Sequence, residues 1–317
     1  MSNRRHFLLG AATALAATAT RRGWAEADQA KRDRVSVMTL DFNPIIKSPV
    51  HPDDPKRTLD ILDYADMIAE HYSLHHVEFQ HSHFTSTETA YLQEVRDRIK
   101  KAKSQMNQIN VEFGALNISA TDPVVRLETI DLTKQWIDHA ALLGCPHVMI
   151  NQGTLAPEVR QAAIDTMKAM VAYGKPKKIA ITMENRGGGG GAGRGRGGAP
   201  GQQGQQGQMA NAAPTPPRPR GATWEEVVEV LKAAGGYANC DIGNFPDEES
   251  RHAGERVMFK MSAGGAHCHY APERWDFDAA MAIPRELGYK GTFSIEHSGP
   301  DPYAAVQTVL DAILKNL

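Results

Sequence analysis

The sequence predicts a single (β/α)8 TIM barrel, and three observations carry this prediction. From residue 34 onward, eight short apolar runs alternate with amphipathic stretches, which is typical of parallel strands joined by helices. Four successive runs in the C-terminal half are closed by ligand-type side chains: Glu184, Asp241, His269 and Glu296. The gaps between them are 57, 28 and 27 residues, and the first shrinks to 22 without a 35-residue low-complexity segment. Each gap is then about one strand–helix unit of roughly 30 residues.

The elements are expected in the following order. We expect strands at 35–40, 76–80, 111–118, 147–152, 178–184, 237–241, 264–270 and 292–296. Helices are expected at 58–70, about 88–106, 122 to about 143, from 157, after 223, at 247–257, at 276–287 and from 301. Asp-Pro pairs at 122–123 and 301–302 indicate helix starts, and Thr223 with Glu226 forms a capping box. A doubly wound sheet is the competing fold, but it would more often carry a Gly-rich phosphate loop after the first strand.

The barrel domain is expected at 28–317, preceded by a signal peptide and interrupted by a low-complexity insertion. Residues 1–27 begin with Arg4-Arg5 before an apolar, Ala-rich stretch, and end in a small-x-small cleavage pattern, which predicts a twin-arginine signal peptide. Residues 187–221 are rich in Gly, Gln and Pro and lack apolar bulk, so we expect a disordered insertion in a surface loop. A twin-arginine signal predicts export to the periplasm, without stable membrane insertion once the signal is cleaved.

Composition argues against a nucleic-acid partner and against a disulfide framework. The chain holds 35 Lys and Arg against 37 Asp and Glu, but eight of the arginines fall within 1–27 and 187–221. The remainder is acidic, which argues against a nucleic-acid surface. Three cysteines are too few, and odd in number, for a disulfide framework. A small carbohydrate substrate is the expected partner, and assembly into a homo-oligomer stays open.

Strand parity sharpens the candidate site. Because alternate residues of a strand share a face, Glu184, Asp241, His269 and Glu296 are expected to point inward, and Cys240 and Cys268 outward. Enclosed carboxylates need a cation, since an isolated buried charge is too costly. An oxygen-rich donor set with one imidazole suits a divalent metal. Polar strand ends are also where barrels of this class place their active sites.

The order strand-Glu, strand-Asp, His-x-His, strand-Glu resembles the xylose isomerase-like TIM barrels of the sugar phosphate isomerase/epimerase superfamily. The resemblance covers about residues 34–317 and is carried by residues 181–185, 240–244, 266–269 and 294–296. It implies one Mn²⁺, Mg²⁺ or Co²⁺ ion, with Zn²⁺ as an alternative, bound by Glu184, Asp241, His269 and Glu296. His267 is expected one level deeper, as a partner behind the metal site or in contact with substrate, and it is the alternative ligand. Glu78 ends the second strand, where the family often has a glutamate near the substrate.

Further substrate contacts are expected at the strand ends, from His81, Asn117, Asn151 and Arg274. A purely structural role stays open for each of them. The chain departs from the ketose epimerases of the family, because Asn244 stands where they have a histidine and Tyr270-Ala271 where Lys-Asp is usual. Arg274 is not a clean match to the family's arginine. These departures put a free-ketose epimerase in doubt and fit a substrate without a phosphate.

The expected chemistry follows from the residues. A divalent cation chelated by a sugar carbonyl and its neighbouring hydroxyl stabilises an enediolate, and Glu184 and Glu296 can move the proton next to that carbonyl. Epimerisation or isomerisation results, or a lyase or dehydratase reaction on a keto sugar or glycoside if a leaving group lies β to the carbanion. A phosphodiesterase like the endonucleases of this superfamily, and a non-catalytic sugar-binding protein, are the other classes considered.

Overall fold

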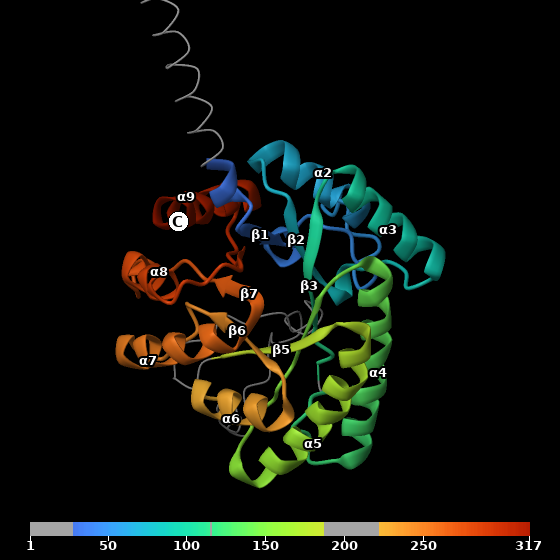
Figure 1. Ribbon diagram of the computed structural model, residues 1–317. Helices are drawn as coiled ribbons and strands as arrows, with labels where there is room; N and C mark the ends of the chain where they lie inside the picture. Colours follow the sequence, from blue (N-terminus) through green and yellow to red (C-terminus); the bar gives the residue numbers. More distant parts are fainter. Residues whose placement is uncertain (1–27, 115, 187–221) are drawn as a thin grey trace, which may run out of the picture.

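The computed structural model describes residues 28–114, 116–186 and 222–317. Eight parallel strands close into one barrel in sequential order, and helices surround it (Figure 1). The closing pair is β1 with β8, in which Val35 aligns with Phe293 and Val37 with Ile295. The predicted (β/α)8 fold is therefore confirmed. The predicted signal peptide at 1–27 and insertion at 187–221 lie outside the described residues.

The strands are short and almost wholly buried, as a barrel wall covered by helices requires. They are β1 Val35–Met38, β2 His76–Gln80, β3 Gln105–Val111, β4 His147–Ile150, β5 Ala180–Glu184, β6 Tyr237–Asp241, β7 Ser262–Cys268 and β8 Thr292–Ile295. The α-helices are α2 Ile61–Tyr72, α3 Thr89–Lys101, α4 Pro123–Leu143, α5 Pro157–Gly174, α6 Trp224–Ala234, α7 Glu248–Met258, α8 Phe277–Glu286 and α9 Pro302–Asn316. Short 3-10 turns follow β1 and β2, at Thr39–Phe42 and His81–His83.

The predicted helix starts are confirmed by side-chain caps. Asp122 accepts the backbone N–H of Val124, and Asp301 accepts those of Tyr303 and Ala304. In the capping box, Thr223 accepts from the Glu226 amide and Glu226 from the Thr223 amide. Each cap satisfies helix N–H groups that have no partner within the helix, so these sequence signals set the helix boundaries.

The third strand is where the element prediction was wrong. We expected it at 111–118, but β3 is Gln105–Val111, and three of its polar side chains, Asn107, Gln108 and Asn110, are buried in the barrel interior. This interior polarity hid the apolar periodicity that marks the other strands. The apolar run that follows is broken at Gly114, whose positive φ of 65° forms a turn. Asn117 consequently lies in a loop and not at a strand end.

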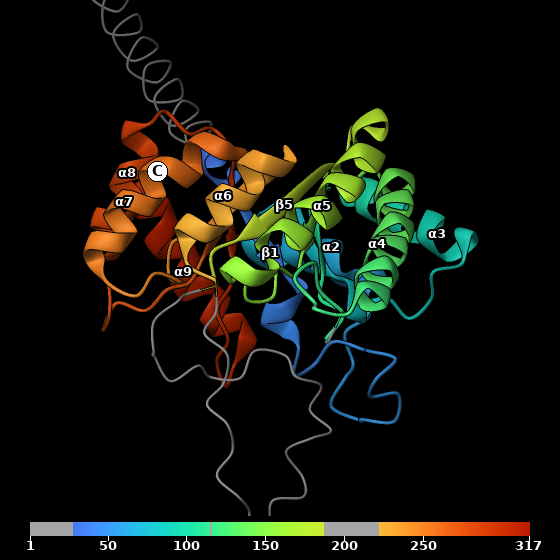
Figure 2. The ribbon, with the colours of Figure 1, turned by 90° about the horizontal axis from the view of Figure 1, so that it is seen from below.

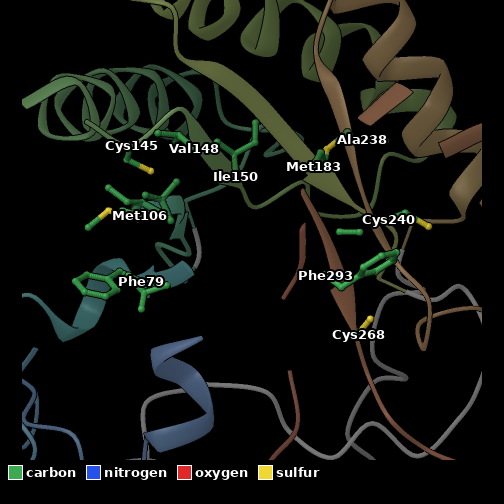
Figure 3. Packing of buried hydrophobic residues seen from close by; sticks show 14 of the residues in the cluster. Phe79, Met106, Cys145, Val148, Ile150, Met183, Ala238, Cys240, Cys268 and Phe293 are labelled. Carbon is green, nitrogen blue, oxygen red and sulfur yellow. The ribbon is translucent and has the colours of Figure 1, made fainter. Parts of the chain in front are cut away.

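The apolar core lies between the strands and the helices. Met183, Cys240, Cys268 and Phe293 project outward from the barrel wall into this layer (Figure 3). Cys240 and Cys268 are fully buried free thiols, which confirms the parity prediction that they face away from the barrel interior. Figure 2 shows the segment between β1 and α2 extending beyond one end of the barrel. The opposite faces of the same strands supply the site.

Candidate metal centre

Four buried side chains converge at the C-terminal ends of the last four strands. Glu184 ends β5, Asp241 ends β6, His267 is the penultimate residue of β7, and Glu296 directly follows β8. Each offers one ligand atom, and these atoms all lie within 4.8 Å of one another. We call these four residues the inner cluster. Three of them are predicted ligands, and the fourth is the histidine that the sequence analysis held as the alternative.

His267 connects the two glutamates of the inner cluster. Its Nδ1 atom is 2.9 Å from Oε2 of Glu184 and 3.0 Å from Oε2 of Glu296, and its Nε2 atom is 2.7 Å from Oε1 of Glu78. Burial by itself would lower the pKa of His267, but attraction to Glu78 and hydrogen bonds to Glu184 and Glu78 raise the pKa to about 10. In the absence of another cation, a protonated His267 therefore offsets part of the negative charge of these carboxylates.

His269 lies beside the inner cluster and touches two of its carboxylates. Its Nδ1 atom is 2.8 Å from Oδ2 of Asp241 and 3.8 Å from Oε2 of Glu296, and its side chain is 29% exposed. This close approach requires a glycine at 243, because a Cβ there would lie 2.2 Å from the Cβ of His269. The backbone N–H of Gly243 and the side-chain amide of Asn244 donate to Asp241 and orient it.

The donor set fits a divalent cation. Ligand atoms about 2.1 Å from one ion in octahedral geometry lie about 3 Å apart when adjacent. Three of the four contacts of the two histidine Nδ1 atoms with the carboxylates of the inner cluster measure 2.8–3.0 Å, and the fourth, between His269 and Glu296, measures 3.8 Å. Glu184 and Asp241 are about 1% exposed or less, and Glu296 is 4% exposed. Buried carboxylates this close together repel unless cations offset them. Oxygen-rich sites of this kind suit Mg²⁺, Mn²⁺ or Co²⁺.

Glu78 lies beneath the inner cluster, inside the barrel. It is 1% exposed, and its Oε1 atom accepts hydrogen bonds from Asn110 at 2.6 Å and Gln108 at 3.1 Å, besides its contact with His267. Burial would raise the pKa of Glu78, but the charge and hydrogen bond of His267 outweigh it and lower the pKa. These contacts orient His267, and the predicted contact of Glu78 with a substrate stays a prediction.

The other predicted substrate residues lie outside the inner cluster. His81 accepts the Glu112 backbone N–H through Nδ1, and its ring packs on Phe113 and Trp136. Asn117 and Asn151 lie in loops, where they make local hydrogen bonds with Ser119 and with Gly153 and Gly114. Arg274 is exposed and stacks on Trp275, 4.9 Å from its ring centroid. Their contact with a substrate stays a prediction.

Three charged residues near the site were missed from the sequence. Arg186 pairs with Glu184 and Glu112, and buried Asp41 accepts the backbone N–H of His297, next to Glu296. Alternation along the strand would have revealed Arg186, which shares parity with Glu184. The misplaced third strand concealed Glu112, which directly follows β3. Asp41 lies in the 3-10 turn after β1, where no periodicity indicates direction.

No protein-family model matches the chain, and no curated protein matches it by sequence. Solved structures do match over nearly the whole chain. D-allulose 3-epimerase from Methylomonas sp. matches with a TM-score of 0.64 at 12% identity, covering 90% of this chain and 98% of its own. A xylose isomerase domain protein from Planctomyces limnophilus has a TM-score of 0.59 at 12% identity, and the match covers 89% of this chain and 96% of that protein. The 3-keto-D-glucoside 4-epimerase from E. coli has a TM-score of 0.59 at 12% identity, and the match covers 90% of this chain and 99% of that protein.

None of the described helices is both long and apolar enough to cross a membrane. At 11–18% identity the similarities to solved structures establish the fold. The protein is a single (β/α)8 TIM barrel whose structural neighbours include sugar epimerases and a xylose isomerase domain protein, and it carries a buried group of three carboxylates and a histidine that could hold a divalent metal.

Proposed function

We propose that this protein is a divalent-metal-dependent sugar isomerase or epimerase that acts on a non-phosphorylated sugar or sugar derivative. The observation that carries the proposal is the inner cluster, in which three carboxylates and an imidazole meet at the C-terminal ends of four strands. The solved epimerases of the same fold support the choice of substrate class and reaction. A bound cation would polarise the substrate carbonyl and stabilise the enediolate that forms when a neighbouring proton leaves.

We assign the cation to Glu184, Asp241, Glu296 and His269. Either His267 on β7 or His269 just after β7 could supply the nitrogen ligand, since both contact carboxylates of the inner cluster. His269 is favoured because its side chain is partly exposed, at the end of the barrel where a substrate enters. Both ring nitrogens of His267 are already held by glutamates. The contact of His267 with Glu78 would also orient a metal ligand, so paired variants are needed to decide between them.

Glu184 and Glu296 are the proposed acid and base. Their Oε2 atoms lie 2.9 and 3.0 Å from the same nitrogen of His267, so the two carboxylates lie close enough together to flank a substrate held by one cation. A sugar carbon held there would lie within reach of both, which is the requirement for taking a proton with one group and returning it with the other. Return to the opposite face of the same carbon gives an epimer, and return to the neighbouring carbon gives an isomer.

The experiment that tests the function is turnover in heavy water with ketoses and 3-oxo sugars, followed by mass spectrometry. We expect the reacting carbon to gain deuterium, and Glu296→Gln and Glu184→Gln each to lose at least about 10²-fold in rate, the usual scale for a positioned acid or base. Turnover without deuterium would indicate hydride shift, and an unsaturated product would indicate a lyase. Wild-type rates in both variants would remove these glutamates from the mechanism.

The preference for a non-phosphorylated substrate rests on the proposed export through the twin-arginine pathway. Arg4 and Arg5 carry that proposal, and sugar phosphates are largely cytoplasmic. Fractionation of cells that express the full chain should place the wild type in the periplasm and an Arg4→Lys, Arg5→Lys double variant in the cytoplasm. Cytoplasmic wild type would remove this argument for the substrate class and leave the metal site untouched.

A further inference from the structure

Arg186 joins the inner cluster to the end of a strand on another side of the barrel. Its Nε atom is 2.8 Å from Oε1 of Glu184, and its guanidinium also pairs with Glu112. Glu112 directly follows β3, while Glu184 ends β5, so the pair spans the intervening strand β4. Among the residues that the structure describes, Arg186 is the arginine or lysine that pairs with a carboxylate of the inner cluster.

The guanidinium of Arg186 retains hydrogen-bond donors that Glu184 and Glu112 do not fully engage. Its Nε atom is buried, and although Oε1 of Glu184 is close, the N–H is aligned on no acceptor among the described residues. A guanidinium carries five N–H donors, and two carboxylates cannot engage them all in favourable geometry. A buried donor without an acceptor is rare in folded proteins and points to a ligand that completes it.

The position of Arg186 also contrasts with that of Arg274, the arginine expected from sequence to contact substrate. Arg274 is exposed and stacked on Trp275. Arg186 is held by two carboxylates, and its side chain is 23% exposed, so it combines a fixed orientation with access. A planar guanidinium held in this way recognises a pair of oxygens better than a flexible lysine does.

We propose that Arg186, anchored by Glu112, binds an anionic oxygen of the substrate beside the cation and thereby selects substrates that carry or develop negative charge there. The enediolate formed in the reaction and the carboxylate of an oxidised sugar share this oxyanion chemistry. The inference rests on the proposed function, because it takes the inner cluster as the place where the substrate carbonyl binds. It places at Arg186 a substrate-binding arginine, whereas the sequence pointed to Arg274 as a substrate contact.

The test compares two small probes on the Mn²⁺-loaded protein by electron paramagnetic resonance. Glycolate offers a hydroxyl and a carboxylate, and hydroxyacetone offers a hydroxyl and a neutral carbonyl. In Arg186→Met we expect the Kd for glycolate to rise at least about tenfold, the scale of a hydrogen bond to a charged group, with the Kd for hydroxyacetone within about twofold. Arg186→Lys should fall between, and Glu112→Gln should weaken glycolate binding less than Arg186→Met does. Arg274→Met tests the competing arginine, and its Kd for glycolate should stay within about twofold of the wild type.

The outcomes separate this inference from the function on which it rests. If Arg186→Met binds Mn²⁺ as wild type does but keeps its affinity for glycolate, only the inference fails. Equal losses for both probes would mean that Arg186 merely supports the site, which also overturns it. A loss of glycolate affinity in Arg274→Met and not in Arg186→Met would return the role to Arg274. Failure of the wild type to bind Mn²⁺ would overturn the proposed function and this inference together. If glycolate failed to bind the Mn²⁺-loaded wild type, only the inference would fall.

Discussion

Two groups of charged side chains, one fully buried and one built on a buried ion pair, lie on opposite faces of the barrel wall, and their differences explain why only one is proposed as a site. The inner cluster takes its residues from four strands, with three carboxylates and one histidine. The outer cluster, Glu248, Arg251 and Glu255, lies on α7 outside the strands. Arg251 is 2% exposed and pairs with Glu255 at 3.3 Å and with Glu248. Charge is offset within one helix in the outer cluster, whereas in the inner cluster the carboxylates outnumber the histidine.

Burial of charge does not by itself indicate function. Residues three and four positions apart on a helix face one another, so α7 brings its own compensating partner to each carboxylate. The strands of a parallel barrel bring side chains together only at their ends, and here they bring mostly like charges. Such an arrangement is stable when a cation is bound, because its charge offsets the repulsion.

The largest expected effect on stability comes from replacing Arg251, the positively charged residue of the outer cluster. Arg251→Met should lower the free energy of unfolding by up to about 3–5 kcal/mol, because the buried Glu255 loses its partner and must either stay ionised without it or take up a proton. Urea denaturation measures the loss. Mn²⁺ affinity of the folded variant should remain that of the wild type, and a loss of metal binding without loss of stability would break the distinction between the clusters.

The next effect sharpens the ligand assignment within the inner cluster. His269→Asn should lose nearly all Mn²⁺ affinity, since it removes a ligand, while His267→Asn should weaken Mn²⁺ by about 10- to 100-fold, the usual cost of removing a group that orients the ligands. Titration with Mn²⁺ compares the two variants directly. The reverse order of losses would assign the metal to His267.

A smaller effect is expected in the pH dependence of stability. Burial is the main cause that raises the pKa of Glu255 to about 8, with Arg251 opposing it. Between the ordinary value of 4.5 and about pH 8, the folded state therefore holds a proton that the unfolded state has lost, so this residue makes stability fall as pH rises. Glu255→Gln should remove up to about 1.4 kcal/mol per pH unit from that slope. An unchanged slope from pH 5 to 8 would show that Glu255 is ionised in the fold.

The smallest effect is expected from replacing the predicted insertion, which contains no residue of either cluster. Its sequence lacks core-forming residues, so we predict that a short Gly-Ser link in place of 187–221 shifts the Tm by no more than a few degrees, because loop length costs little free energy. Thermal unfolding with and without Mn²⁺ is the measurement. Collapse of expression or loss of metal binding would mean that the segment packs against the barrel.

Much of the fold and most of the inner cluster could be predicted because the signals are local. Apolar runs that end in Glu184 and Asp241 indicate both a strand and the direction of its last side chain. The third strand escaped because Gln108 and Asn110 are polar for an interior that only the closed barrel creates. The contact of Glu78 with His267 spans 189 positions, and no local pattern reports such pairing. The outer cluster was also missed, since its charges resemble an ordinary solvated helix face.

The central claim, that the inner cluster holds a divalent metal, is tested most directly by the metal content of the purified protein. After removal of metal with a chelator, titration with Mn²⁺ should give about one tightly bound ion per chain in the wild type and in Glu255→Gln, and none in Asp241→Ala. That result would place the ion in the inner cluster and leave the outer cluster structural. Stoichiometric Mn²⁺ in Asp241→Ala, or none in the wild type, would contradict the account.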